Sequence, residues 1–380
     1  VLPSWMALYY DEPISLVDGE GRHVVDAERN RYLDFFGWIL TTMSGYKVPE
    51  VVEAIKRQAD RMLHTSTLYL IESQIELAER ISELSGIPDA KVFFTNSGTE
   101  ANDAALMLAT QHRRSNQVLA LRGSYHGKSH SAVAITGQRS WSATGYSPFN
   151  VTYVHGGYTY RSPFGHLPED EFIAACVADL ENMLEVATAG DVAAMIIEPI
   201  QGVGGFITPP DGLFGAMKEV LDRHGILFIS DEVQTGWGRT GEHFWGYQSH
   251  GIVPDVMTFA KGLGNGLAMA GVIASAELMD SLPANSISTF GGNPLSTAGA
   301  LANLEYLIEH DLQTNAYKVG NHLRNRIDGL AERVESIGEV RGKGLMIGIE
   351  MVEPGSNRAD KHGAAEVMEQ AKNRGLLVGK

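Results

Sequence analysis

The sequence predicts an α/β fold in which helices cover both faces of a mostly parallel sheet. From residue 91 onward, short apolar runs typical of buried strands alternate with polar turns and helical patterns. Continuous apolar runs of this kind favour parallel strands that are buried on both faces. With 380 residues, the chain can form a large core and more than one lobe.

The predicted elements follow in order from the N-terminus. Strands are predicted at 14–17, 23–26 and 31–36, and helices at 49–63 and 75–84. The alternating part follows, with strands at 92–94, 118–121, 192–197, 226–229, 256–260 and 271–274 and helices at 101–114 and 213–223. The last part is predicted to hold helices at 294–309, 312–335 and 364–374 and a strand within 340–352. We therefore expect a large lobe at 62–305 and a smaller lobe built from 1–61 and 306–380, with the last segment truncated.

Charge and composition exclude several classes of protein. The 30 Lys and Arg residues against 46 Asp and Glu give a formal net charge of −16, which argues against nucleic acid or an anionic membrane as a partner. No apolar stretch approaches the length of a membrane span. The 13 histidines show no zinc-type spacing, so no metal site is predicted. The single cysteine, Cys176, allows no internal disulfide and favours a reducing, cytoplasmic location.

The stretch at 226–261 gives the first indication of chemistry. One apolar run ends in Asp231 and Glu232, and a second ends at Lys261. Both ends are expected at the same edge of the sheet, where ligands bind in open α/β folds. Lysine forms Schiff bases with carbonyl cofactors, and pyridoxal phosphate (PLP) pairs such a lysine with an Asp at its ring nitrogen. The alternative, a capping Asp231 and a solvated Lys261, is commoner for this spacing alone.

Four further clusters lie at predicted turns or strand ends. Residues 97–99 (Ser-Gly-Thr) open a helix and suit a phosphate, although an ordinary helix cap has the same pattern. Residues 125–127 (Tyr-His-Gly) offer a ring that either stacks on a flat cofactor or packs under a loop. Glu198 ends an uncharged strand, and Arg341 is of the type that grips carboxylates. For Glu198 and Arg341 alone, a surface charge is the commoner interpretation.

Together these clusters resemble the class III (omega) aminotransferases, PLP enzymes of fold type I, and are closest to the alanine–glyoxylate and 4-aminobutyrate type. The resemblance covers essentially the whole chain. It rests on seven phrases in one order: NSGTEAN (96–102), YHG (125–127), EPIQG (198–202), DEVQTGWGR (231–239), AKG (260–262), TFGGNP (289–294) and VRGKGLMIGIEM (340–351). It implies a large domain with a mostly parallel seven-stranded sheet between helices, and a smaller α+β domain from both chain ends.

The resemblance also implies roles around the cofactor ring. Lys261 looks like the Schiff-base lysine, which moves a proton between the substrate Cα and the cofactor. Asp231 looks like the partner of the ring nitrogen. Val233 and Tyr125 are implied to cover the two faces of the ring, and Gln234 to reach the phenolic oxygen.

The phosphate and substrate positions come from the same resemblance. Thr289 is implied to complete the phosphate site from a neighbouring subunit, which makes the protein a homodimer or a dimer of dimers. Arg341 is implied to bind the α-carboxylate of the acceptor, and Glu198 to pair with Arg341 when the donor lacks that group. The other cofactor-binding positions, which include the phosphate cradle, are Ser97, Gly98, Thr99 and His126.

The expected reaction is a ping-pong transfer of an amino group to a 2-oxo acid such as pyruvate, glyoxylate or 2-oxoglutarate. The donor is an amine or amino acid such as alanine or 4-aminobutyrate. A phospholyase that acts on an amino-alcohol phosphate and a non-catalytic truncated homologue are the alternatives. Four positions depart from the family pattern, mostly around the substrate mouth, and bear on substrate identity: Arg29, Trp38, Tyr46 and Ala268.

Overall fold

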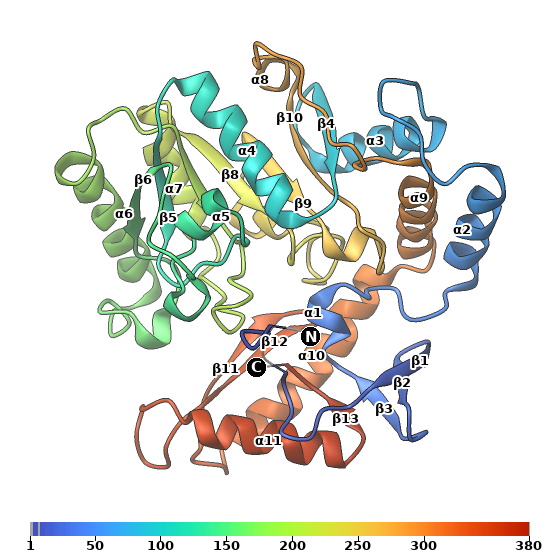
Figure 1. Cartoon of the computed structure of the whole chain (residues 1–380). Coiled ribbons are helices and arrows are strands. Elements are labelled where there is room, and N and C mark those ends of the chain that lie inside the picture. The colour runs from blue at the N-terminus through green and yellow to red at the C-terminus, as the bar shows by residue number, and fades with distance from the viewer. Residues whose placement is uncertain (1–2, 7, 380) are drawn as a thin grey trace.

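A seven-stranded sheet forms the centre of the computed structural model, which describes residues 3–6 and 8–379 (Figure 1). The strand order is β4-β10-β9-β8-β7-β5-β6. β10 runs antiparallel to its neighbours β4 and β9, and all other neighbouring strands are parallel. The strands are β4 (Ala90–Thr95), β5 (Gln117–Leu121), β6 (Asn150–Val154), β7 (Ala194–Ile197), β8 (Leu227–Asp231), β9 (Val256–Phe259) and β10 (Ala270–Ser275). The predicted mostly parallel sheet is confirmed.

Helices pack on both faces of this sheet because successive residues of a strand point to opposite sides. On one face, Met195 and Phe228 pack against α6 and α7, where Cys176 is a fully buried core residue. On the other face, Ala194 and Ile229 pack against α4. The strands are therefore mostly apolar on both faces. The helices around the sheet are α4 (Gly98–Arg113), α5 (His130–Ala134), α6 (Glu169–Val186), α7 (Leu213–Arg223) and α8 (Ala276–Met279).

A second sheet, of four strands, joins the two ends of the chain in the order β1-β2-β3-β13 (Figure 1). β13 pairs parallel to β3, so Leu377 shares a small core with Val24 and Tyr32. The strands are β1 (Leu16–Glu20), β2 (His23–Asp26), β3 (Arg31–Asp34) and β13 (Leu376–Leu377). In the lower part of Figure 1, the same lobe holds α10 (Leu312–Ala331), the hairpin of β11 (Ile337–Lys343) and β12 (Met346–Met351), and α11 (Lys361–Asn373).

Three helices outside both sheets pack together, two from the segment between β3 and β4 and one that follows β10. α2 (Pro49–Arg61) and α3 (Glu72–Ser85) both contact α9 (Pro294–Glu309). α2 thus touches a helix of the predicted large lobe although it precedes the boundary expected at residue 61. The division of the chain at 61 and 305 stays a prediction. Four 3-10 helices complete the fold, namely η1 (Arg139–Trp141), η2 (Thr159–Arg161), η3 (Gly246–His250) and η4 (Lys261–Leu263).

The short α1 (Gly37–Leu40) is a left-handed turn. Its four residues all have positive φ, from 53° at Trp38 to 63° at Leu40. Left-handed backbone costs about 1–2 kcal/mol for each residue with a Cβ, so the surroundings must hold this turn in place. One contact that does so is the 2.6 Å hydrogen bond from Arg239 Nη2 to the backbone oxygen of Leu40.

Candidate active site

The carboxyl ends of β4, β5, β7, β8 and β9 meet at one edge of the central sheet, because these strands all run in the same direction. Asp231 ends β8, and Lys261 follows β9 by two residues. Tyr125 and Glu198 follow β5 and β7, and Gly98 opens α4 after β4. Residues far apart in the sequence are thereby brought to the place where open α/β sheets bind ligands.

The Asp231 carboxylate is buried and held by three donors. His126 Nδ1 and Asn102 Nδ2 each donate to Asp231 Oδ2 at 2.8 Å. The backbone N–H of Val233 donates to Asp231 Oδ1 at 3.1 Å. No lysine or arginine pairs with this carboxylate in the part of the chain that the structure describes. Three donors therefore hold the Asp231 carboxylate in place, while Oδ1 keeps room for one more donor, such as a protonated ring nitrogen.

The Lys261 amine is free to react. Among residues 3–6 and 8–379, it makes no hydrogen bond or ion pair. Burial, opposed by Asp231 and Glu198 and helped by Arg239, lowers the pKa of Lys261 to about 8. A lowered pKa increases the share of neutral amine near neutral pH, and the neutral amine is the nucleophile in Schiff-base chemistry.

The backbone of Lys261 is held in an unusual conformation. Its φ is 45°, in the left-handed region. Asn303, on α9, donates through Nδ2 to the backbone oxygens of Gly262 and Leu263, each at 2.9 Å. These two buried hydrogen bonds fix the turn that carries the lysine, as expected for a strained residue at a functional site.

The first turn of α4 lies next to the loop at residues 127 and 128. Ser97 Oγ accepts from Glu100 N at 3.3 Å, and Thr99 Oγ1 accepts from Lys128 N at 3.2 Å. Gly127 has a φ of 132°, and a Cβ there would lie 2.3 Å from Thr99 Oγ1. Gly127 therefore lets the loop at residues 127 and 128 approach the first N–H groups of α4, a 16-residue helix. Such a helix N-terminus is where a phosphate binds well.

Two side chains frame the space between the phosphate position and Asp231. Val233 packs among small alanines, and a Cβ at Gly98 would come 3.0 Å from its methyl group. Tyr125 is half-buried, with its ring edge-on to Trp141 at a centroid distance of 5.4 Å. Burial, reinforced by the nearby Glu198, raises the pKa of Tyr125, so the ring stays neutral.

Gln234 supplies an amide that lacks a partner. Its Oε1 is buried without a hydrogen bond to any described residue. A Cβ at Gly202 would lie 2.0 Å from this oxygen, so the glycine is needed for the amide to fit. A free amine, a fixed anionic carboxylate, a helix N-terminus and an unpartnered amide together fit PLP.

Glu198 and Arg341 are not joined in this structure. Glu198 accepts from Tyr125 N at 2.8 Å and from Gly202 N at 2.9 Å, and burial raises its pKa to about 7. Arg341 is instead paired with Glu339 at 2.6 Å and with Glu350 at 3.0 Å. Arg341 Nε also donates to the backbone oxygen of Gly205 at 2.8 Å. The Arg341 charge is therefore already balanced by two carboxylates, and the Glu198–Arg341 pair expected with a donor that lacks a carboxylate stays a prediction.

Thr289 stands apart from the residues above. It is exposed, in a loop that Asn96 holds through a 3.2 Å hydrogen bond from Nδ2 to Ser288 Oγ. No metal cluster of three or more His, Cys, Asp or Glu side chains occurs among the described residues. No helix in that part of the chain has the length and apolar character needed to cross a membrane.

Sequence reasoning missed three residues that hold this site, namely Asn102, Thr258 and Arg239. Asn102 lies on the face of α4 that also carries the buried residues Ala105, Leu106 and Ala109. A polar side chain on an otherwise apolar helix face needs a buried partner, and that was the available signal. Thr258 and Arg239 gave no comparable signal, because Asn102 and Leu40, which they contact, lie on distant segments.

Comparisons with known proteins place this geometry in context. Residues 7–380 match the family model described as aminotransferase class-III. The mitochondrial alanine–glyoxylate aminotransferase 2 homolog 2 of Arabidopsis thaliana is 39% identical over 390 residues, covering 100% of this chain and 78% of the relative. A leucine/methionine racemase of Thermococcus litoralis is 37% identical over 371 residues, covering 96% of this chain and 83% of the relative. The structure of a thermostable (S)-enantioselective omega-transaminase from Thermomicrobium roseum has a TM-score of 0.90 at 35% identity, covering 97% of this chain and 86% of that chain.

Proposed function

The chain belongs to the class-III aminotransferases, and from that premise we propose that Lys261 and Asp231 form its reactive centre. One observation carries the assignment. A lysine amine without a partner and a carboxylate held by three donors follow the adjacent strands β9 and β8 at the same edge of the sheet.

The cofactor is pyridoxal phosphate, whose protonated ring withdraws electrons and so acidifies the Cα–H bond of an attached amino acid. We propose that the N-terminus of α4 and the hydroxyls of Ser97 and Thr99 hold the phosphate. Val233 and Tyr125 would enclose the ring, with His126 behind Asp231. The Gln234 amide would donate through Nε2 to the phenolic oxygen, which accepts hydrogen bonds.

Lys261 would also move the proton that transamination requires. Its Nζ would take the proton from Cα of the donor and deliver it to the cofactor side, and it would reverse these roles in the second half-reaction. A pKa of about 8 suits both directions near neutral pH, because neither protonation state of Nζ is strongly favoured. The amino group would thereby pass from one substrate to the other by way of the cofactor, without release of free ammonia.

We propose alanine or a similar small amino acid or ω-amine as donor and glyoxylate, pyruvate or 2-oxoglutarate as acceptor. The support is the relative named alanine–glyoxylate aminotransferase. Glu198 remains a proposed substrate-side group, since it is buried beside Tyr125 and titrates near pH 7. Arg341 is a weaker candidate for the acceptor carboxylate, because such a carboxylate must displace Glu339 or Glu350.

We also propose that the chain works as a homodimer, or as a dimer of dimers, with the site at the subunit interface. Leu68, Tyr69 and Leu70 are 75%, 70% and 92% exposed, and Phe290 is 60% exposed. These exposed apolar side chains lie on two segments, and His64 of the first segment contacts the Phe290 ring of the second, next to Thr289, at a centroid distance of 5.2 Å. A large exposed apolar patch of this kind is typical of a covered interface. A cytoplasmic location is proposed from the single cysteine, and cell fractionation tests it.

The visible absorbance of the protein with PLP tests this function. A band should form on adding the cofactor to the purified protein, disappear with one amino donor, and return with a 2-oxo acid. If a band forms but no donor changes it, the proposed cofactor site stands and the proposed substrate class is refuted. Failure of any band to form would refute the reactive centre.

A further inference from the structure

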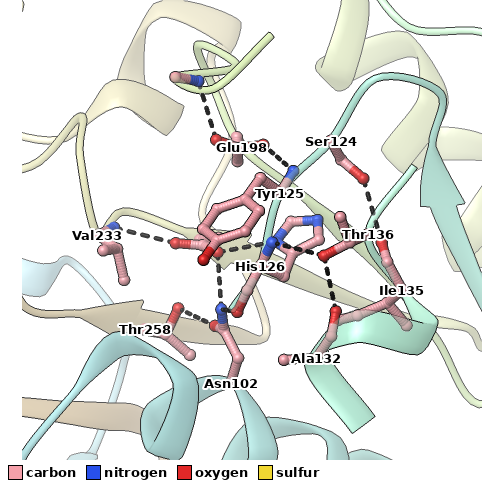
Figure 2. A network of polar contacts seen from close by, with 12 residues as sticks. Asn102, Ser124, Tyr125, His126, Ala132, Ile135, Thr136, Glu198, Val233 and Thr258 are labelled. Atoms are coloured by element: carbon pink, nitrogen blue, oxygen red, sulfur yellow. Dashed lines mark hydrogen bonds and ion pairs between the residues drawn. The ribbon is translucent and has the colours of Figure 1, made fainter. Parts of the chain in front are cut away.

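Asn102 lies between three functional groups from separate elements (Figure 2). Its Nδ2 donates to Asp231 Oδ2 and to the backbone oxygen of His126, both at 2.8 Å. Its Oδ1 accepts from Thr258 Oγ1 at 2.7 Å. Asp231 and Thr258 are in-register partners on β8 and β9, so α4 places Asn102 over both side chains. Asn102 thus links the carboxylate to the neighbouring strand.

Every polar group of this amide has a defined partner. Asn102 is 1% exposed and Thr258 is fully buried, so water cannot replace a missing contact. If the amide turned over, its oxygen would face the Asp231 carboxylate and the His126 carbonyl, which also accept hydrogen bonds. One orientation is therefore permitted, and the Thr258 hydroxyl satisfies the oxygen that this orientation directs away from Asp231.

We propose that Asn102 and Thr258 are positioning residues that set the orientation of the Asp231 carboxylate toward the cofactor ring nitrogen. The inference rests on the proposed function of Asp231. With His126 and Asn102 both on Oδ2, that oxygen has no lone pair left for another donor. Oδ1 carries only the 3.1 Å contact from Val233 N, so it is the oxygen that would have a lone pair available for the ring N–H.

The Thr258 hydroxyl is hydrogen-bonded to the carboxylate only through Asn102. It donates to Asn102 Oδ1. The backbone oxygen of Thr258 accepts from Glu232 N at 2.9 Å, a contact that a change of side chain leaves in place. Replacing the hydroxyl by a methyl group keeps the shape of residue 258 but leaves Oδ1 of Asn102 buried without a donor. The amide then holds Asp231 less firmly, because hydrogen bonds in a buried chain strengthen one another.

The test compares Thr258→Val with Thr258→Ser, which keeps the hydroxyl, in the PLP-loaded protein. Two quantities are followed: the rate of PLP release, read from the visible band after dilution into a cofactor trap, and the pH at which that band changes. We expect Thr258→Val to release PLP about tenfold faster, as for loss of a hydrogen bond to a charged group. Its band should also change at a shifted pH, and Thr258→Ser should stay within about twofold of wild type.

A double-mutant cycle separates positioning from packing. In the Asn102→Ala background, Thr258→Val should have almost no further effect on PLP release, since its only route to Asp231 is gone. Cofactor-free unfolding in urea, measured for each variant, records the purely structural cost. The inference would be overturned if Thr258→Val released PLP at the wild-type rate. It would also be overturned if Thr258→Val had the same effect on PLP release in the wild-type and Asn102→Ala backgrounds. The proposed function would stand in both cases. A wild-type protein that forms no band would overturn the inference and the proposed function.

Discussion

Arg239 Nη2 donates to the backbone oxygen of Leu40 at 2.6 Å, which fastens the left-handed turn at 37–40 to the segment that follows Asp231. Arg239 Nε also donates to the backbone oxygen of Gln234 at 3.1 Å. Burial lowers the pKa of Arg239 to about 10, and no carboxylate pairs with it among the described residues. One guanidinium therefore supports both the turn at 37–40 and the segment that carries Gln234.

Replacing Arg239 by Met should destabilise the protein and loosen the turn. The backbone oxygens of Leu40 and Gln234 would lose their donor, and each buried acceptor without a partner costs about 1–3 kcal/mol. We expect the cofactor-free variant to lose roughly 2–4 kcal/mol of unfolding free energy in urea. Hydrogen exchange at residues 37–42 should also accelerate. An unchanged unfolding midpoint would show that the turn does not depend on Arg239.

The sequence predicted the sheet edge better than the residues that support it. Asp231 and Lys261 end apolar runs, and that pattern is local, so their meeting at one edge followed from strand direction. The turn at Trp38 could not be foreseen, because Trp, Ile and Leu disfavour positive φ and a distant Arg239 holds them there. The Arg341–Glu350 ion pair depends on the register of β11 and β12, which the pattern of residues does not determine.

Replacing Lys261 by Met should stabilise the cofactor-free protein near neutral pH. The folded pKa of about 8 lies below the ordinary value of 10.5, so the unfolded chain binds more protons between these values and wild-type stability rises with pH there. At pH 7 the Met variant should be more stable by up to about 3 kcal/mol, and the difference should vanish as the pH approaches the ordinary lysine value. Urea unfolding across this range measures it. A difference that does not change with pH would contradict the lowered pKa.

Replacing Arg341 by Ala should act mainly on stability. The change would leave Glu339 and Glu350 without this shared cation, and breaking a buried pair costs about 3–5 kcal/mol. We expect thermal unfolding at a lower temperature and similar losses of kcat/KM for donor and acceptor. If Arg341 instead binds the acceptor, only the KM of the 2-oxo acid should rise, with little loss of stability.

Replacing Phe290 by Glu should separate the proposed subunits. A charge in the apolar surface formed with residues 62–70 would be costly to bury between two copies of the chain. Light scattering after size-exclusion chromatography should show monomers and weaker PLP retention at low protein concentration. The control is Val186→Glu, since Val186 is 65% exposed on another part of the molecule, at the end of α6. Equal oligomeric states for both variants would place the interface elsewhere.

The most direct test of amino transfer through Lys261 follows the nitrogen itself. The PLP-loaded protein would be incubated with 15N-alanine and glyoxylate, and the products resolved by mass spectrometry. The account predicts 15N-glycine and pyruvate in equal amounts with the wild-type chain and none with Lys261→Met. Retention of all 15N on alanine, with exchange only of the Cα hydrogen, would contradict it and indicate racemisation instead.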